Sequence, residues 1–251
     1  MSTVNDPVAA QVWLDSPLGQ YVARREQHYF DGAVADIFGY HALQLGMSDW
    51  ELLRASRIPL RVRVAGSGDV GLRADFRDLP VDTGSVDLML LPHTLEYSGD
   101  PHQVVREAAR VLRPEGRLLL SGFNPVSLWG VRRLFGGQQA FPWNGRFIQL
   151  SRVKDWFALL GLEIVAGAMA GYAPPCTSQQ WLDRFSFMEK AGDRWWPIGG
   201  GVYFLQAIKH VRGIRLIMPR WGERASAKKR LAAAPERVRD QDAAAARSRT
   251  A

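Results

Sequence analysis

The sequence predicts an α/β protein with a doubly wound, mostly parallel sheet and helices on both of its faces. Two observations lead to this fold class. Short apolar runs alternate with amphipathic segments along the chain, as in proteins whose parallel strands are joined by helices. The runs at 86–91 and 118–120 are nearly continuous in apolar residues, which is typical of strands that are buried on both faces.

Length and composition fit one main globular domain. The chain has 251 residues, 47% of them hydrophobic and 23% charged, so it can bury a sizeable core. A single cysteine, Cys176, cannot form an internal disulfide, and no charged and apolar leader opens the sequence, so we expect a cytoplasmic protein. No apolar stretch reaches the roughly 18 residues that a bilayer-crossing helix needs, so we expect no membrane span.

The first half of the chain supplies an N-terminal helical segment and three strands. Residues 1–40 form the helical segment, because apolar and charged residues alternate from 13 to 38 with amphipathic helical spacing. Short strands are expected at 41–46, 60–65 and 72–75. The connection between the strands at 60–65 and 72–75 is short and has Gly-Ser-Gly-Asp at its centre. It leaves no room for the crossover helix that usually joins parallel strands.

The middle of the chain predicts a strand, a helix and a second strand. Asp100 and Pro101 are suited to begin a helix, as an N-cap and a first-turn proline, and amphipathic spacing continues to Leu112. The run Arg-Pro-Glu-Gly at 113–116 should stop this helix before a strand at 117–121. Together with the strand at 86–91, this order predicts a right-handed parallel crossover.

The remainder predicts one more helix and two strands. Residues 151–161 have amphipathic spacing between a serine cap, Ser151, and a terminal glycine. Strands are expected at 162–165 and 202–208, which completes a domain over 41–221. Residues 222–251 are rich in Ala, Arg and Lys and poor in large apolar residues, so we expect a disordered basic tail.

The basic tail raises the question of a nucleic-acid partner. From 223 onward it holds eight Lys and Arg residues against four acids, which supplies +4 of the formal net charge of +7. A solvated tail is the commoner explanation for so modest an excess, and we rank nucleic-acid binding last.

Four motifs carry a resemblance to a known family. They are Asp-Phe-Arg-Asp-Leu-Pro at 75–80, Ser-Val-Asp-Leu-Met-Leu at 85–90, His-Thr-Leu-Glu at 93–96 and the helix with its Arg-Pro-Glu-Gly end at 104–118. In this order and spacing they resemble the class I S-adenosylmethionine-dependent methyltransferases of the type 11 group, over about residues 72–125. The resemblance implies a Rossmann-like fold and S-adenosylmethionine as cofactor, bound where the parallel strands end.

The resemblance assigns the adenine of the cofactor to Asp75 and Phe76. A carboxylate can accept a hydrogen bond from the adenine amino group, and an aromatic ring can cover the base. The alternative is that Asp75 is a solvated acid at a strand end and Phe76 a core residue.

By the same resemblance, Leu91, Pro92 and His93 border the methionine part of the cofactor and contact it through backbone groups. His93 has a second interpretation, since a lone histidine at such a junction is more often a capping or packing residue than a base. Glu96 is expected to be scaffolding of the same kind.

The cofactor loop after the first strand departs from the family pattern. Members usually show an acid followed by three glycines, whereas this chain has Gln-Leu-Gly-Met-Ser-Asp-Trp at 44–50. Gly46 and Met47 are the candidate cofactor contacts, and Trp50 should obstruct or reshape the close backbone approach that glycines allow. The second strand also lacks the family's ribose-binding acid in register, although Asp69 lies nearby.

Two aromatic groups could cover an acceptor. The first combines aromatic residues with arginines between 124 and 147, and the second lies between 181 and 196. Such residues could hold an apolar or anionic acceptor, or could form a peripheral core with arginines extended over it.

The leading hypothesis is an S-adenosylmethionine-dependent methyltransferase with a small-molecule acceptor. No residue pattern identifies a catalytic base, and no Cys or His cluster has the spacing of a metal site. The alternative hypothesis is a non-catalytic methyltransferase-like protein that has lost cofactor binding and serves in binding or assembly. The sequence does not identify the acceptor or the oligomeric state.

Overall fold

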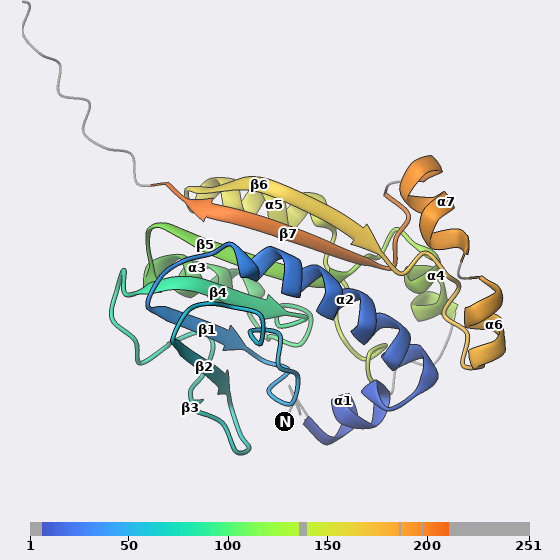
Figure 1. Cartoon of the computed structure of the whole chain (residues 1–251), viewed down its shortest axis with the longest axis horizontal. Helices are drawn as coiled ribbons and strands as arrows, with labels where there is room; N and C mark the ends of the chain where they lie inside the picture. Colours follow the sequence, from blue (N-terminus) through green and yellow to red (C-terminus); the bar gives the residue numbers. More distant parts are fainter. Residues whose placement is uncertain (1–6, 136–139, 186, 197, 211–251) are drawn as a thin grey trace, which may run out of the picture. The chain divides into compact units, whose positions relative to one another are not determined.

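The computed structural model describes residues 7–135, 140–185, 187–196 and 198–210. Seven strands form one sheet in the order β3-β2-β1-β4-β5-β7-β6 (Figure 1). The elements in chain order are α1 (Pro7–Leu14), α2 (Pro17–Ala35), β1 (His41–Leu45), β2 (Leu60–Ala65), β3 (Leu72–Arg73), β4 (Val86–Pro92), α3 (Pro101–Val111), β5 (Leu112–Phe123), α4 (Leu128–Phe135), α5 (Leu150–Leu159), β6 (Leu162–Ala170), α6 (Gln179–Arg184), α7 (Phe187–Trp195) and β7 (Val202–Lys209).

The sheet is mostly parallel, as the sequence predicts. Strands β3, β2, β1, β4 and β5 run parallel to one another. β7 lies between β5 and β6 and is antiparallel to both. Among the described residues, we find no helix with the length and apolarity to cross a bilayer.

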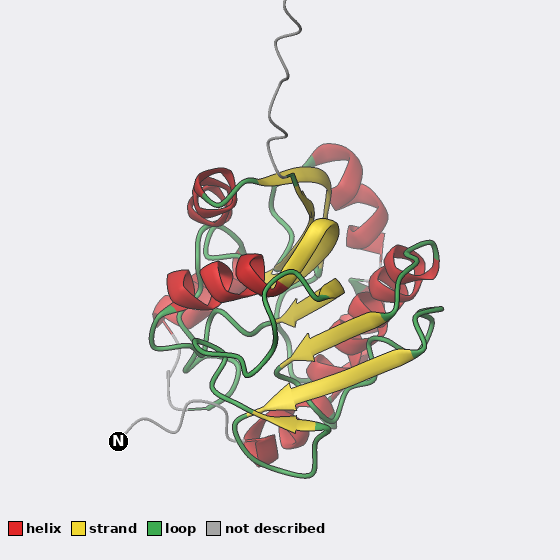
Figure 2. Cartoon of the chain, turned by 90° about the vertical axis from the view of Figure 1, so that its left-hand side faces the viewer, coloured by secondary structure: helices red, strands yellow, loops and turns green. Residues whose placement is uncertain are grey.

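Helices cover both faces of the sheet (Figure 2). On one face α3 and α5 pack over a core that includes Leu43, Met89 and Phe157. On the other face α2 packs over a second core, to which Phe30 and Phe204 belong. Successive side chains of a strand point to opposite faces, so strands covered on both sides must be apolar at nearly every position.

Three local predictions were wrong. The first helix is divided in two, because the Ser16 hydroxyl caps the second helix by accepting the Gly19 N–H at 3.1 Å and Pro17 takes its first position. Residues 113–116 are an irregularity inside β5, where pairing shifts from Val86↔Leu112 to Leu88↔Arg117. Helix α5 begins at Leu150 without a side-chain cap, so Ser151 lies within its first turn.

The connection between β2 and β3 contains no helix, as predicted. These two strands nevertheless pair in parallel through two residue pairs, Val64↔Leu72 and Ala65↔Arg73. The predicted tail at 222–251 lies outside the described residues, as does the end of the predicted 41–221 domain.

One buried carboxylate ties the amino end of β1 to β4 and β5. Asp87 accepts the backbone N–H groups of Tyr40 and His41 at 2.7 and 2.9 Å and forms an ion pair with Arg113. Burial alone would raise the pKa of Asp87, but the two N–H donors and the guanidinium outweigh it and lower the pKa below its usual value. A side chain at Gly39 would collide with this carboxylate, since a Cβ there would lie 2.4 Å from the Asp87 side chain.

We expect Asp87→Ala to lower the free energy of unfolding at pH 7 by about 3 kcal/mol, because two N–H donors and a guanidinium lose their acceptor. Urea unfolding measures the change, and the exposed Asp69→Ala should stay within about 0.5 kcal/mol of the wild type. The difference should shrink as the pH falls through the depressed pKa of Asp87 and its carboxylate is protonated. Equal stability of both variants at pH 7 would contradict this role.

Candidate functional site

A cavity of about 790 Å³ opens at the carboxyl ends of the parallel strands. Its lining includes Gly46 after β1, Gly66 after β2, Asp75 after β3 and His93 after β4. Residues of α1 and the 141–144 segment complete the lining. This volume lies within the range of cofactor sites, and the position is where open parallel sheets bind ligands.

The structure brings together six of the seven residues that the sequence nominated. Leu91 is absent from the lining, because its side chain is fully buried in the core beneath α3 and α5. The cofactor contacts of all seven stay predictions. The residues that line the cavity are Gly46, Met47, Asp75, Phe76, Pro92 and His93.

The loop after β1 turns sharply at two successive left-handed residues. Gly46 has φ +79° and Met47 has φ +45°, a region that only glycine adopts without cost. A Cβ at Gly46 would lie 3.3 Å from Thr94 Oγ1, a tight contact that would add to the strain of the left-handed backbone there. The turn leaves the loop backbone beside the cavity.

Gln44 fastens this loop from the inside. Its buried amide donates to the carbonyls of Met47 at 3.0 Å and Trp50 at 2.7 Å, and its Oε1 accepts the Leu52 N–H at 3.3 Å. A carboxylate could not donate to these carbonyls. Sequence reasoning noted only the missing acid, and an amide at the end of a buried strand is the signal that it passed over.

Trp50 does not fill the cavity. Its side chain is 8% exposed and belongs to the core under α2, where its Nε1 donates to Gln27 Oε1 at 3.0 Å. Trp50 is nevertheless one of the residues that line the cavity. Of the two expected effects of Trp50, the structure therefore favours a reshaped loop over an obstructed cavity.

Asp75 sits at the rim in a two-pronged ion pair with Arg77. Arg77 Nη2 lies 2.5 Å from Asp75 Oδ2, and Nε lies 3.0 Å from Oδ1. Hydrogen bonds from the Arg77 side chain, then its backbone N–H, lower the pKa of Asp75 to about 2. The carboxylate is half exposed and ionised at neutral pH, so it can still accept a further hydrogen bond.

A second acid, Asp49, also borders the cavity. It lies in the loop after β1, together with Ser67 from the end of β2, whereas Asp69 is not part of the lining. Arg63 donates to the Ser48 carbonyl at 2.8 Å and so ties this loop to β2. Sequence reasoning missed Asp49 because it searched for an acid at the end of the second strand.

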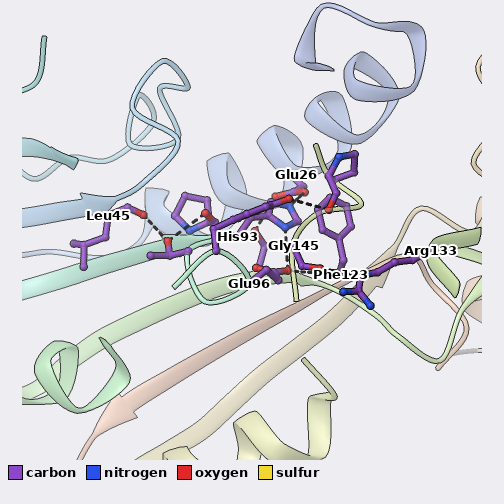
Figure 3. Close-up of polar contacts among 12 residues, drawn as sticks. Glu26, Leu45, His93, Glu96, Phe123, Arg133 and Gly145 are labelled. Carbon is purple, nitrogen blue, oxygen red and sulfur yellow. Dashed lines mark hydrogen bonds and ion pairs between the residues drawn. The ribbon is translucent and has the colours of Figure 1, made fainter. Parts of the chain in front are cut away.

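Behind the cavity, His93 lies between two buried glutamates (Figure 3). Its Nε2 is 2.6 Å from Glu26 Oε1 and its Nδ1 is 3.3 Å from Glu96 Oε1. Glu26 also accepts the Ser121 hydroxyl at 2.8 Å, and Phe123 stacks on the imidazole with ring centroids 4.1 Å apart. All three ionisable side chains are essentially without solvent exposure.

This buried cluster favours the structural interpretation of His93. Burial disfavours the charged imidazole, but the negative charges of Glu26 and Glu96 outweigh it and raise the pKa of His93 to about 10. The ring is therefore protonated at neutral pH and both of its nitrogens are engaged. It holds α2 against β4 and offers no free nitrogen to a substrate.

The two aromatic groups differ in burial. In the first, Trp129 and Phe147 stack on Phe123, and Trp143 packs at a tilt against Trp129, as a peripheral core. In the second, Trp181 is 51% exposed and packs on Phe185. Among the described residues, no cluster of His, Cys, Asp and Glu could hold a metal ion.

We expect Glu26→Gln to lower the free energy of unfolding by about 3 kcal/mol at pH 6, because it removes a buried partner of a charged imidazole. His93 stabilises the fold fully below its unfolded pKa of 6.5, and this contribution is lost as the pH rises toward about 10. The difference between the wild type and Glu26→Gln should therefore shrink between pH 6 and pH 10.

Urea unfolding across this pH range tests the prediction, with the exposed Glu51→Gln as the matched control. A Glu26→Gln defect of constant size would show that His93 is not charged in the folded protein.

Comparisons with known proteins agree with this geometry. A family model described as a methyltransferase domain matches residues 55–120. The uncharacterized protein YafS of Escherichia coli (strain K12) is 36% identical over 161 residues, which cover 63% of this chain and 67% of YafS. The malonyl-[acyl-carrier protein] O-methyltransferase of Hahella chejuensis is 32% identical over 89 residues, which cover 36% of this chain and 32% of that enzyme.

The fold is also similar to that of solved methyltransferases. A SAM-dependent methyltransferase of Thermotoga maritima, described as a possible histamine N-methyltransferase, superimposes with a TM-score of 0.60 at 15% identity. The superposition covers 79% of this chain and 93% of that one. The chain therefore belongs to the class I S-adenosylmethionine-dependent methyltransferases, in the type 11 group.

Proposed function

We propose that this chain binds S-adenosylmethionine in the cavity at the strand ends and transfers its methyl group to a small-molecule acceptor. The observation that carries the proposal is the convergence of six nominated residues on one cavity of about 790 Å³. The left-handed turn at Gly46 fits the proposal, because it leaves the loop backbone beside the cavity without a side chain at this residue.

The adenine end of the cofactor would lie near Asp75 and Phe76. The ionised carboxylate of Asp75 would accept a hydrogen bond from the adenine amino group and share its remaining lone pairs with Arg77. Phe76 would cover one face of the base. At the other end, the backbone of Gly46, Met47 and Pro92 would border the methionine part, while Leu91 would support this wall from behind.

Asp49 would take the place of the ribose-binding acid that β2 lacks. It is exposed, it lines the cavity beside Ser67, and no described side chain forms an ion pair with it. A carboxylate can accept hydrogen bonds from both ribose hydroxyls. The loop after β1 would thus supply the ribose-binding acid that other members of the family have at the end of the second strand.

Bound S-adenosylmethionine supplies a methyl group already activated by its sulfonium. The chain's own residues would bind, orient and exclude water, and we assign no catalytic base because both nitrogens of His93 are engaged. Tyr97, Phe141 and Asn144 stand on the cavity wall and would border the acceptor.

Calorimetric titration with S-adenosylmethionine and S-adenosylhomocysteine tests the proposal. We expect wild-type binding, and we expect Asp75→Ala and Asp49→Ala each to weaken it about tenfold or more, because each removes a charged acceptor. Asp69→Ala, an acid just outside the cavity, is the matched control and should bind like the wild type.

The outcomes separate the possible roles. If the wild type does not bind up to millimolar ligand, the methyltransferase proposal fails and the non-catalytic alternative stands. If Asp75→Ala abolishes binding and Asp49→Ala does not weaken it, the cofactor site holds and the ribose role of Asp49 is wrong.

A further inference from the structure

The cluster of Glu26, His93 and Glu96 holds more negative than positive charge (Figure 3). Both glutamates form their ion pairs with the same imidazole, Glu26 at 2.6 Å and Glu96 at 3.3 Å. One ring carries at most one positive charge, so two ionised carboxylates leave at least one negative charge in excess. The three side chains are essentially without solvent exposure, and water therefore does not screen this charge.

Glu96 is the carboxylate whose charge is less compensated. Its Oε1 accepts the Phe123 N–H at 2.5 Å and lies 3.3 Å from His93 Nδ1. Its Oε2 is buried and has no hydrogen-bond partner among the described residues. Glu26, in contrast, has a partner at each oxygen, namely His93 Nε2 and the Ser121 hydroxyl. The excess negative charge of the cluster is therefore least neutralised at Glu96.

The charge of Glu96 acts on the wall of the cavity. His93 and Tyr97 both line the cavity, and Glu96 contacts the first and directly precedes the second. Burial, and then the charge of Glu96, raise the pKa of Tyr97 well above its usual value, while Arg133 on α4 opposes them with a smaller effect. The electrostatic potential at this part of the wall is therefore negative.

In the proposed binding mode this part of the wall would face the sulfonium. The adenine would lie near Asp75 and the methionine part near Gly46 and Pro92, with the sulfur between them and its methyl group directed toward the acceptor wall at Tyr97. S-adenosylmethionine and S-adenosylhomocysteine differ only at the sulfur, where the first carries a methyl group and a positive charge. A negative potential favours a cation over a neutral group of nearly the same shape.

We propose that Glu96 makes the cavity favour S-adenosylmethionine over S-adenosylhomocysteine, because it holds an uncompensated negative charge behind the wall that the sulfonium faces. Glu96 does not line the cavity, so it acts through its charge and not by contact. Methyl transfer returns the bonding electron pair to sulfur and leaves a neutral thioether, so the same carboxylate promotes the exchange of product for new cofactor. This proposal rests on the proposed cofactor site.

Calorimetric titration of Glu96→Gln with both ligands tests the proposal. A glutamine keeps Oε1 for its two N–H donors and places an amide group at the oxygen that has no partner, so the charge is lost and the hydrogen bonds remain. At pH 6, below the ordinary histidine pKa of 6.5, Glu26 should keep the imidazole charged. We expect the ratio of the Kd for S-adenosylhomocysteine to the Kd for S-adenosylmethionine to fall about fivefold or more.

A second ligand and a second variant separate charge from shape and from folding. Sinefungin carries a protonated amine in place of the sulfonium methyl, so Glu96→Gln should weaken its binding as it weakens that of S-adenosylmethionine. Glu26→Gln removes a charge from the other side of the ring and should shift the ratio in the same direction. The matched control is Glu107→Gln, a buried carboxylate that Arg110 neutralises at 2.6 Å, and its ratio should equal that of the wild type.

Failure of this proposal is distinct from failure of the cofactor proposal. If both glutamine variants bind the two ligands with the wild-type ratio, or with equal losses for each ligand, Glu96 does not select the charged cofactor and the cofactor site itself stands. An equal fall of the ratio in Glu107→Gln would also overturn the proposal. If the wild type binds neither ligand up to millimolar concentration, both proposals are wrong.

Discussion

A charged imidazole between two buried carboxylates joins the N-terminal helices to the sheet. Glu26 belongs to α2, His93 follows β4 and Glu96 lies in the next turn, so the cluster spans segments far apart in the chain. Such a cluster tolerates little displacement, because separation of the charges in a site without water is costly. α2 is thereby fixed over the sheet, and α1, which packs against α2, contributes Ala10, Gln11 and Leu14 to the cavity.

The centre of the sheet was predictable from sequence because its central strands are covered on both faces. Alternate residues of β4 enter opposite cores, so the whole strand had to be apolar and could be recognised without knowledge of its partners. The division of the first helix at Ser16 and the irregularity at 113–116 were harder to predict. The first depends on a local hydrogen bond and the second on strand pairing. Neither an amphipathic pattern nor a run with Pro and Gly reveals such contacts.

The residues of the candidate site that follow strand ends could be predicted from the sequence. Those whose role depends on contacts between distant parts of the chain could not. Asp75 and His93 could be placed at the edge of the sheet from the order of the strands alone. The partner of His93 could not be predicted in this way. Glu26 precedes His93 by 67 positions, and its sequence context is that of an ordinary charged residue on an amphipathic helix. The role of Gln44 could not be predicted either, because it depends on side-chain hydrogen bonds to the loop that follows this residue.

The anchoring of Trp50 on Gln27 has an evolutionary consequence. The family pattern has a glycine at this place in the loop, whereas here Trp50 is also a structural member of the helical layer. Replacement of Trp50 by glycine would leave a void beside α2 and the Gln27 amide oxygen without its donor, so a glycine here fits this fold only if α2 changes as well. Substitutions in the loop and in α2 are therefore epistatic, and the two segments must diverge together.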